Sequence, residues 1–367
     1  MVQRTGAGQS GKHVVTKNNL FTQLKNGRKL SMQIMKRKLG LVPPRIPLRI
    51  DLNVTKECNL SCRHCYASLE SVKHTKDPSF GQIKDVIDDV YAHGCRWFRL
   101  VGGEPLLRDD IGEIAKYARK KGMFVEISTN GLLVKKRIKE LKEIDAVCVS
   151  LDGSKETNDF LRGKGTYEKI VEGLEIGVKS GLKMRLHCVL TSHTISSLKH
   201  MVDISKKYDV NMNFGEIAGG NDWEGEYKDI AEDELIQFYD EYEKYKRAGV
   251  RISNSFKTIR YARNWRWKDK FTLYEDGKCL NDFQDSFKVI PCKLGRLYAF
   301  IDVDGGMYPC TKLWKHGINY YEEGFGKAWK HLGSLNCLSC REMSSPELSL
   351  ILSGNVGALL NGILRFA

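Results

Sequence analysis

The sequence predicts an α/β protein: a partial (βα)6 barrel followed by a small, cysteine-rich α+β domain. Six apolar, strand-like runs recur between residues 48 and 216, and segments with helical spacing separate them. Six consecutive β/α units favour a parallel sheet with covering helices, curved or closed as a partial barrel. Beyond residue 250 the rhythm gives way to shorter β-like pieces and turns that carry the last cysteines.

Each β/α unit has its own sequence signal. The predicted strands are Leu48–Val54, Trp97–Val101, Phe124–Ser128, Ala146–Leu151, Met184–Leu190 and Val210–Glu216. Apolar residues at helical spacing predict helices through Ile83, Val86, Ile87, Val90 and Tyr91, through Ile170, Val171, Leu174 and Val178, and through Leu235, Phe238, Tyr239 and Tyr242. Helical runs are followed by Gly94, Gly122 and Gly181, where a left-handed cap would end a helix.

These signals divide the chain into five parts. We expect a basic arm over 1–45, with an amphipathic helix as an option, the barrel over 46–250, an aromatic and basic linker over 251–279, the cysteine-rich domain over 280–345 and an apolar helix over 346–367. The tail Leu348–Leu364 has no charged residue. One helical face of this tail can hold Leu348, Ile351, Leu352, Leu359 and Ile363.

The net charge of +14 belongs almost entirely to the arm. Residues 1–50 hold eleven Lys and Arg and no acidic residue, which leaves 48 basic against 45 acidic side chains in the rest. Such an arm could lie on an anionic membrane or on nucleic acid, or be a solvated tail. Its apolar residues include Leu20, Phe21, Leu24, Ile34 and Met35. With the C-terminal helix they could form an interfacial attachment, or both segments could pack on the barrel.

The sequence predicts a cytoplasmic, oxygen-sensitive protein, with peripheral membrane contact as an option. No stretch of 18 consecutive apolar residues is present, and the first residues lack the apolar core of a signal peptide. Eleven cysteines in such a chain indicate metal ligands or buried thiols more than disulfides. We expect Cys95, Cys148 and Cys188, within or beside strands, to be buried apolar residues.

The stretch CNLSCRHC places Cys58, Cys62 and Cys65 directly after the first strand. This spacing suits an iron–sulfur cluster, whose irons prefer thiolate ligands. Three thiolates on a four-iron cluster leave one iron open for a substrate or cofactor. A structural zinc site would need a fourth ligand, and His64, adjacent to Cys65, would be strained in that role.

Three further loops follow the next three predicted strands. They are GGEP (102–105), STNG (128–131) and SLDG (150–153). Loops after the strands of a parallel barrel meet at one end, so all four loops are expected to face one pocket. In this pocket Gly102 and Gly103 allow close approach to a ligand, and Glu104 can accept a hydrogen bond from an ammonium group. The remaining polar candidates are Ser128, Thr129, Asn130 and Ser150. Each of these motifs alone is better explained as a turn or a helix cap, and the assignment to a ligand site rests on their combination.

Together the motifs resemble the radical S-adenosylmethionine (radical SAM) superfamily over about residues 46–250. The resemblance implies that Cys58, Cys62 and Cys65 bind a 4Fe–4S cluster whose open iron is chelated by SAM. It also implies that His64 packs on the adenine and that Arg162 lies near the cofactor carboxylate. An electron from a donor such as flavodoxin or ferredoxin would then cleave SAM to methionine and a 5′-deoxyadenosyl radical, which abstracts hydrogen from an unactivated carbon.

A second set of cysteines follows the barrel. The set comprises Cys292, Cys310, Cys337 and Cys340. It resembles the shortened twitch version of the SPASM domain, which implies one auxiliary 4Fe–4S cluster that acts as an electron relay. Four thiolates also suit structural zinc, a cluster could simply staple a small domain, and Cys279 is a spare candidate ligand.

The substrate is the least defined part of the prediction. Our main prediction is a small-molecule or lipid-like substrate; the alternatives are a maturase of a ribosomally made peptide or protein, and a non-catalytic iron–sulfur electron carrier. The aromatic and basic stretch Arg260–Lys268 could grip an anionic substrate or stack on nucleic acid. Since no nucleic-acid-binding motif accompanies it, nucleic acid is not an expected partner. No catalytic acid or base is assigned.

Overall fold

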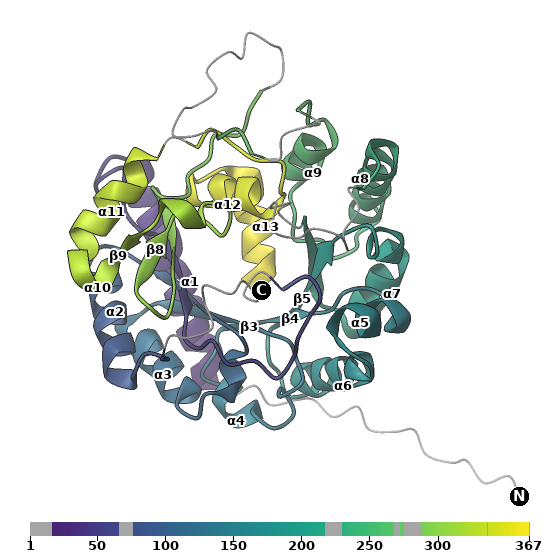
Figure 1. Cartoon of the computed structure of the whole chain (residues 1–367), viewed down its shortest axis with the longest axis horizontal. Helices are drawn as coiled ribbons and strands as arrows, with labels where there is room; N and C mark the ends of the chain where they lie inside the picture. Colours follow the sequence, from purple (N-terminus) through teal and green to yellow (C-terminus); the bar gives the residue numbers. More distant parts are fainter. Residues whose placement is uncertain are drawn as a thin grey trace, which may run out of the picture.

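The computed structural model describes residues 17–65, 76–216, 230–267, 272–274, 288–335 and 337–366, with side chains between Lys25 and Asn361. The predicted α/β fold is confirmed: a curved parallel sheet is surrounded by helices (Figure 1). The barrel strands are β1 (Arg49–Asn53), β2 (Trp97–Val101), β3 (Phe124–Thr129), β4 (Ala146–Ser150), β5 (Met184–Leu190) and β6 (Asn211–Glu216). Each of the six predicted strands is present, with ends within one residue of the prediction.

Helices return the chain from the end of each strand to the start of the next. They are α2 (Phe80–Ala92), α3 (Ile111–Lys121), α4 (Ile138–Leu141), α5 (Lys155–Arg162), α6 (Thr166–Lys179), α7 (Leu198–Tyr208) and α8 (Glu232–Arg247), with short 3-10 turns at Pro105–Leu107 and Ile195–Ser197. The sequence of α2 explains why this segment is helical. Ser79 and Gln82 form a reciprocal capping box at its start, and its apolar stripe is buried. Helix α3 ends at Gly122, whose φ of 98° makes it a left-handed cap, as predicted.

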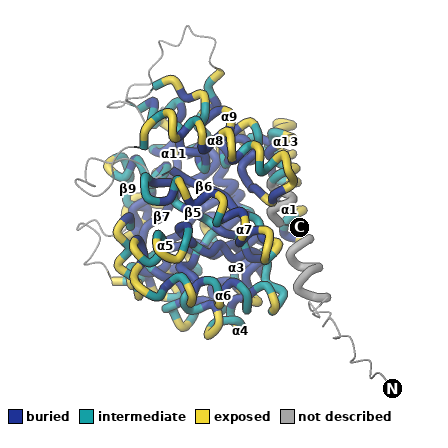
Figure 2. Tube along the Cα trace, turned by 90° about the vertical axis from the view of Figure 1, so that its right-hand side faces the viewer, coloured by how far each residue is buried: buried dark blue, intermediate teal, exposed yellow. Residues whose placement is uncertain are grey.

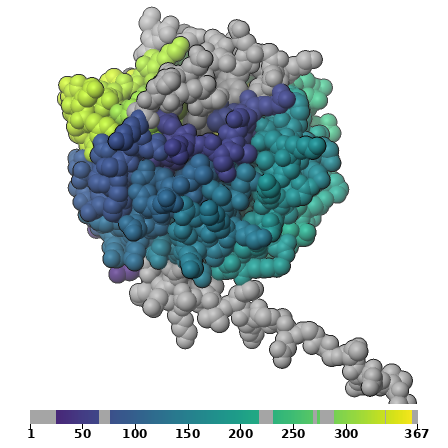
Figure 3. All heavy atoms as spheres, turned by 60° about the horizontal axis from the view of Figure 1, so that its bottom comes forward, coloured from purple at the N-terminus to yellow at the C-terminus, as the bar shows by residue number. Residues whose placement is uncertain are grey.

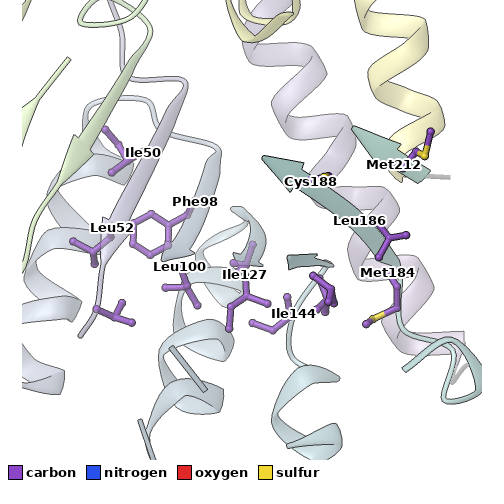
Figure 4. Close-up of a cluster of buried hydrophobic side chains, with 14 of the residues drawn as sticks. Ile50, Leu52, Phe98, Leu100, Ile127, Ile144, Met184, Leu186, Cys188 and Met212 are labelled. Atoms are coloured by element: carbon purple, nitrogen blue, oxygen red, sulfur yellow. The ribbon is translucent and has the colours of Figure 1, made fainter. Parts of the chain in front are cut away.

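The two faces of the curved sheet differ in chemistry because successive strand residues point to opposite sides. The outer face packs its apolar side chains against the helices (Figure 4). Labelled examples are Ile50, Leu52, Phe98, Leu100 and Ile127. The inner face instead carries charged residues such as Asp51, Arg99 and Glu126. Figure 2 shows the strands among the most buried parts of the chain.

The cysteine-rich half extends the same sheet. Strand β7 (Tyr298–Ile301) pairs in parallel with β1, and β8 (Gly306–Tyr308) and β9 (Ile318–Asn319) follow as antiparallel neighbours. The nine described strands run in the order β6-β5-β4-β3-β2-β1-β7-β8-β9, so β6 and β9 are the edges and the barrel is open. The remaining elements of this half are a 3-10 turn at Trp314–His316, α10 (Tyr320–Glu323) and α11 (Phe325–Ser334). The domain limits given above stay predictions.

The N-terminal arm contains a long helix, α1 (Lys17–Lys38), and this helix packs on the barrel. Its residues Leu30 and Ile34 are buried, and the Asn26 amide donates a hydrogen bond of 2.8 Å to the carbonyl of Met123, where β3 begins. On the same helix, Met35 is exposed. The side chains of Leu20, Phe21 and Leu24 lie outside the described residues. No helix in the described ranges is long and apolar enough to cross a membrane, and contact with a membrane surface stays a prediction.

The prediction of one apolar C-terminal helix is wrong, because the tail forms α12 (Ser344–Leu352) and α13 (Val356–Phe366). Gly354, with a φ of 77°, ends the first helix: its N–H donates to the carbonyl of Ile351 and the N–H of Asn355 donates to that of Leu350, the Schellman pattern. The apolar residues of the tail therefore cannot share one helical face. Figure 2 shows α13 beside α1.

Candidate active site

The loops after β1 to β4 lie at one edge of the sheet because these strands run parallel. The segment that follows β1 reaches the surface, where its purple atoms lie beside the blue and teal atoms of the next units (Figure 3). Cys58 is exposed, whereas Cys62 and Cys65 are half-buried. All three predicted cluster ligands thus come from one accessible loop.

The three thiols lie near enough to influence one another. The pKa of Cys62 is raised to about 11, chiefly by burial and also by the charges of Cys65 and Cys58, while Arg162 opposes the rise. The guanidinium of Arg162 lies with its Nη1 3.9 Å from the Cys62 sulfur. Binding to iron would replace the proton on each thiol, and the Arg162 cation would favour the resulting negative charge. The three thiols and their cationic neighbour therefore fit an iron–sulfur cluster.

The two glycines of GGEP allow this loop to lie against the cysteine loop. A Cβ on Gly102 would lie 2.5 Å from the carbonyl oxygen of Thr55, and one on Gly103 would lie 2.2 Å from that of Glu57. In the structure the N–H of Gly103 donates to Thr55 and the N–H of Glu104 donates to Glu57, over 2.9 and 2.7 Å. The sequence predicted that Gly102 and Gly103 allow a ligand to come close. In the structure these glycines instead allow the backbone just before Cys58 to come close.

Glu104 is buried in a ring of neutral donors. Its Oε1 accepts from the N–H of Leu106 (3.0 Å) and from the hydroxyl of Thr129 (2.8 Å), and its Oε2 accepts from the N–H of Asn130 (2.7 Å). Burial raises the pKa of Glu104 to about 7, although these hydrogen bonds oppose the rise. These donors are neutral, so they leave the negative charge of Glu104 without a counter-charge. A cationic ligand would supply that charge, and SAM is a cation.

The STNG residues divide between two places. Thr129 and Asn130 hold Glu104, and the Asn130 amide also donates to the Asn59 side chain of the cysteine loop over 2.7 Å. Ser128 points into the barrel, where its hydroxyl accepts from Arg99. Ser150 is the half-buried last residue of β4. The structure therefore brings Thr129 and Asn130 together with Glu104 and leaves Ser128 facing the interior.

Asp152 is a site residue that the sequence reasoning missed. Its Oδ2 accepts from Arg162, with both nitrogens at 2.7 Å, and from His64 Nε2 at 3.0 Å, and its Oδ1 accepts from the N–H of Val189. Burial opposes ionisation, but Arg162 and His64 hold the pKa of Asp152 below its usual value. The sequence did contain a signal for this ion pair. The SLDG motif supplies the acidic Asp152, and the LRG segment that follows it supplies the basic Arg162.

His64 is thereby directed at Asp152. Its Nδ1 is buried and has no hydrogen-bond partner among the described residues, so the ring can accept or donate one further bond to a ligand. The packing of His64 on adenine stays a prediction. Arg162 is placed between the cysteine loop and Asp152, which is compatible with its predicted position near the cofactor.

The four later cysteines also come together. The thiols of Cys292 and Cys337 are hydrogen-bonded, and the N–H of Cys292 donates to the carbonyl of Leu338 in the C-x-x-C segment. Burial raises the pKa of Cys310 and of Cys340, and the charge of Cys292 raises both further. In the described part of the chain no three His, Cys, Asp or Glu side chains surround a single-ion position. Zinc or a cluster at these thiols stays a prediction, and Cys279 lies outside the described residues.

Residues of the aromatic and basic stretch Arg260–Lys268 make contacts within the protein itself. Helix α9 (Phe256–Arg263) places Arg260 against Glu243 and Arg263 against Asp240 of α8. Its Tyr261 is buried. These two arginines are therefore paired with carboxylates of the protein itself; Lys268 lies outside the described residues.

The fold and the cysteine loop define the class of protein. Residues 52–204 match the Radical SAM superfamily, so this part of the chain is a radical SAM domain and the protein is an enzyme. Family membership implies a 4Fe–4S cluster and SAM as cofactors. Because the chain is an enzyme, the alternative of a non-catalytic electron carrier is without support.

Three curated relatives show how far the similarity extends. Fe-coproporphyrin III synthase of Methanosarcina barkeri is 38% identical over 156 residues, which are 41% of this chain and 39% of that protein. The AdoMet-dependent heme synthase of the same organism is 26% identical over 315 residues, 82% of this chain and 86% of that protein. Mycofactocin maturase MftC of Mycobacterium tuberculosis is 28% identical over 316 residues, 82% of this chain and 73% of that protein.

The fold is shared with solved structures. Streptococcus suis SuiB bound to the precursor peptide SuiA superimposes with a TM-score of 0.61 at 15% identity, over 89% of this chain and 73% of that chain. At this identity the likeness shows the fold alone.

Proposed function

We propose that this chain is a radical SAM maturase that modifies a ribosomally made peptide or protein. The observation that carries the proposal is the length of the similarity to mycofactocin maturase: 316 residues, about twice the 153 that match the superfamily. The similarity therefore extends beyond the part of the chain that matches the superfamily. The fold shared with SuiB, whose structure holds a precursor peptide, agrees with a peptide substrate. The comparisons thus favour this alternative over the small-molecule or lipid-like substrate of the main prediction.

The residues of the four loops would have different roles in binding the cluster and SAM. Cys58, Cys62 and Cys65 would hold the 4Fe–4S cluster, which with bound SAM supplies the one-electron chemistry of the superfamily. Glu104 would bind the positively charged cofactor. Asp152 holds Arg162 beside Cys62, where the cation favours a thiolate over a thiol.

The later cysteines would serve electron transfer. Cys292, Cys310, Cys337 and Cys340 would hold one auxiliary 4Fe–4S cluster, a group suited to moving an electron. Lys312, half-buried near Cys310, makes an ion pair of 3.1 Å with Glu342 and lowers the pKa of the nearby thiols. A fixed cation at this place stabilises thiolates for binding a metal group.

The proposal is tested by co-expressing the gene with the short open reading frames beside it. We expect one encoded peptide to change in mass only when the wild-type enzyme is present, and to keep its unmodified mass with a Cys58→Ala enzyme. If every neighbouring peptide keeps its mass while the enzyme cleaves SAM in the same cells, the peptide assignment is wrong.

A tetrapyrrole substrate is the second candidate. It is favoured by the 38% identity to Fe-coproporphyrin III synthase and by the long match to a heme synthase. Anaerobic incubation with SAM, dithionite and iron-coproporphyrin III or its metal-free form tests it by mass spectrometry. A new tetrapyrrole mass would support this candidate over the peptide, and unchanged tetrapyrroles would eliminate it.

A further inference from the structure

The inner face of the barrel carries a row of charged side chains. Strand register places Asp51 of β1 beside Arg99 of β2, and Arg99 beside Glu126 of β3. On β5 the outward residues are buried, whereas the inward Arg185 and His187 are partly exposed. The interior is thus polar and accessible at the level of these residues.

Both carboxylates of this row are already paired. Arg49 donates to Asp51 through Nε and Nη2, over 2.7 and 2.9 Å, in a bidentate pair. Arg185 donates from Nε to Glu126 Oε1 over 2.8 Å, and the indole of Trp97 donates to the other oxygen over 3.1 Å. Each carboxylate therefore has an arginine that fits it closely.

Arg99 is the third guanidinium, and it shares the Asp51 carboxylate with Arg49, which holds that carboxylate more closely. Its Nη1 lies 3.4 Å from Asp51, its Nη2 donates to the neutral hydroxyl of Ser128, and its Nε is buried with no hydrogen-bond partner among the described residues. The side chain is 21% exposed, so a ligand in the interior can reach it. His187 adds no further positive charge, because burial, Arg185 and Arg99 lower its pKa to about 4.

Arg99 lies close in the chain to residues of the proposed SAM site. It lies three residues before Gly102, and its partner Ser128 directly precedes Thr129, which holds Glu104. The guanidinium is therefore in the barrel interior, close to the loops that would bind SAM. A substrate whose carbon is attacked by a SAM-derived radical must lie beside the loops at the C-terminal ends of the strands, and Arg99 is two residues before the end of β2.

We propose that Arg99, together with Ser128, binds a carboxylate of the substrate inside the barrel. This inference deepens the proposed function and rests on it: the carboxylate belongs to an acidic side chain or terminus of a peptide, or to a propionate of a tetrapyrrole. A carboxylate can take two parallel hydrogen bonds from a guanidinium, which orients the group it is attached to. Ser128, predicted from the sequence as a SAM ligand, is reassigned here to the substrate.

The test uses the anaerobic, SAM-loaded holoenzyme and ligand-observed NMR titration. The probes are N-acetyl-glutamate N-methylamide, its neutral glutamine isostere and coproporphyrin III. We expect the wild-type enzyme to bind at least one acidic probe and not the glutamine isostere, and Arg99→Met to weaken that binding about tenfold to a hundredfold. Which acidic probe binds distinguishes a peptide from a tetrapyrrole source.

Two further variants keep the proposal falsifiable. Arg99→Lys retains the charge beside Asp51 but cannot form the bidentate pair, so binding should weaken less than in Arg99→Met. Arg263→Met, which removes a paired arginine outside the barrel, should bind as the wild type. The proposal is overturned if the glutamine isostere binds equally, if Arg99→Met binds as the wild type, or if Arg99→Met loses affinity for SAM and not for the probes.

Failure of this inference can be separated from failure of the proposed function. An enzyme that modifies its peptide but binds carboxylate probes equally with and without Arg99 contradicts only the inference. An enzyme that binds the probes through Arg99 but modifies no peptide contradicts only the peptide assignment.

Discussion

Asp152 connects the loop after β4 to the loop of three cysteines. It is fully buried, and it accepts hydrogen bonds from Arg162 and His64. The sequence identified the SLDG motif but singled out Ser150, because a motif shows which loop matters and not which of its side chains points inward. The cysteines themselves could be predicted, since their spacing is a property of the sequence alone.

Replacing Asp152 by Asn should destabilise the protein before any cofactor is added. The change leaves a buried guanidinium without its counter-charge, which costs about 3–5 kcal/mol. Thermal unfolding of the apo protein measures it. Asp209→Asn removes an exposed partner of Arg251 and should change stability by less than about 1 kcal/mol. Equal shifts for the two variants would mean that the buried cluster is not formed.

The affinity for SAM should depend on pH through Glu104. Its pKa in the free protein is raised to about 7, so the carboxyl becomes protonated as the pH falls below 7 and then attracts the cofactor less. We expect the Kd for SAM to rise by about tenfold per pH unit below 7, because one pKa unit corresponds to a tenfold change. In Glu104→Gln the dependence should disappear; the same slope in both proteins would assign it to another group.

At the level of elements, the strands of the barrel were predictable because each is short and repeats apolar residues at the spacing of a strand. The pairing of β7 with β1 was not, since these strands are far apart in the sequence and β7 has only four residues. The break between α12 and α13 was missed because Gly354 lies within an uncharged stretch whose apolar residues fit a helical pattern. The left-handed conformation of Gly354 ends α12 and separates it from α13.

The loop GGEP should lose its function when Gly103 gains a side chain. In Gly103→Ala the new Cβ would collide with the Glu57 carbonyl and push the loop from the cysteine segment. SAM affinity measured by equilibrium dialysis should fall about tenfold or more, a loss of at least about 1.4 kcal/mol. Gly27→Ala on α1, where a Cβ meets nothing within 4 Å, should leave the affinity unchanged. Retained affinity in Gly103→Ala would contradict the packing described here.

Helix α1 offers a test of whether the arm packs on the barrel. Ile34 is buried and its neighbour Met35 is 51% exposed on the same helix. Ile34→Ala should reduce the free energy of unfolding by about 2–5 kcal/mol, as for buried aliphatic side chains. Met35→Ala should change it by less than about 0.5 kcal/mol, as for an exposed position. If both have the same small effect in denaturant unfolding, α1 is not docked in solution.

At the level of the whole molecule, one sheet joins the two cysteine sets. Strand β1 leads into the loop of Cys58, Cys62 and Cys65, and its neighbour β7 lies between Cys292 and Cys310 in the sequence. The inner face of the same sheet presents Arg99 to the interior. The fold therefore places the proposed cofactor loops and the proposed substrate contact on one sheet, and Cys292 and Cys310 pack against an apolar cluster that includes Phe300 of β7.

The most direct measurement is the formation of 5′-deoxyadenosine by the anaerobically reconstituted protein with SAM and dithionite. Wild type should produce it, and Cys58→Ala should fall to the level of a reaction without enzyme. Cys95→Ala, which changes a buried thiol outside the loop, should still produce it. A wild-type protein that forms no 5′-deoxyadenosine, or a Cys58→Ala protein that forms as much, would contradict the assignment of the cysteine loop to SAM cleavage.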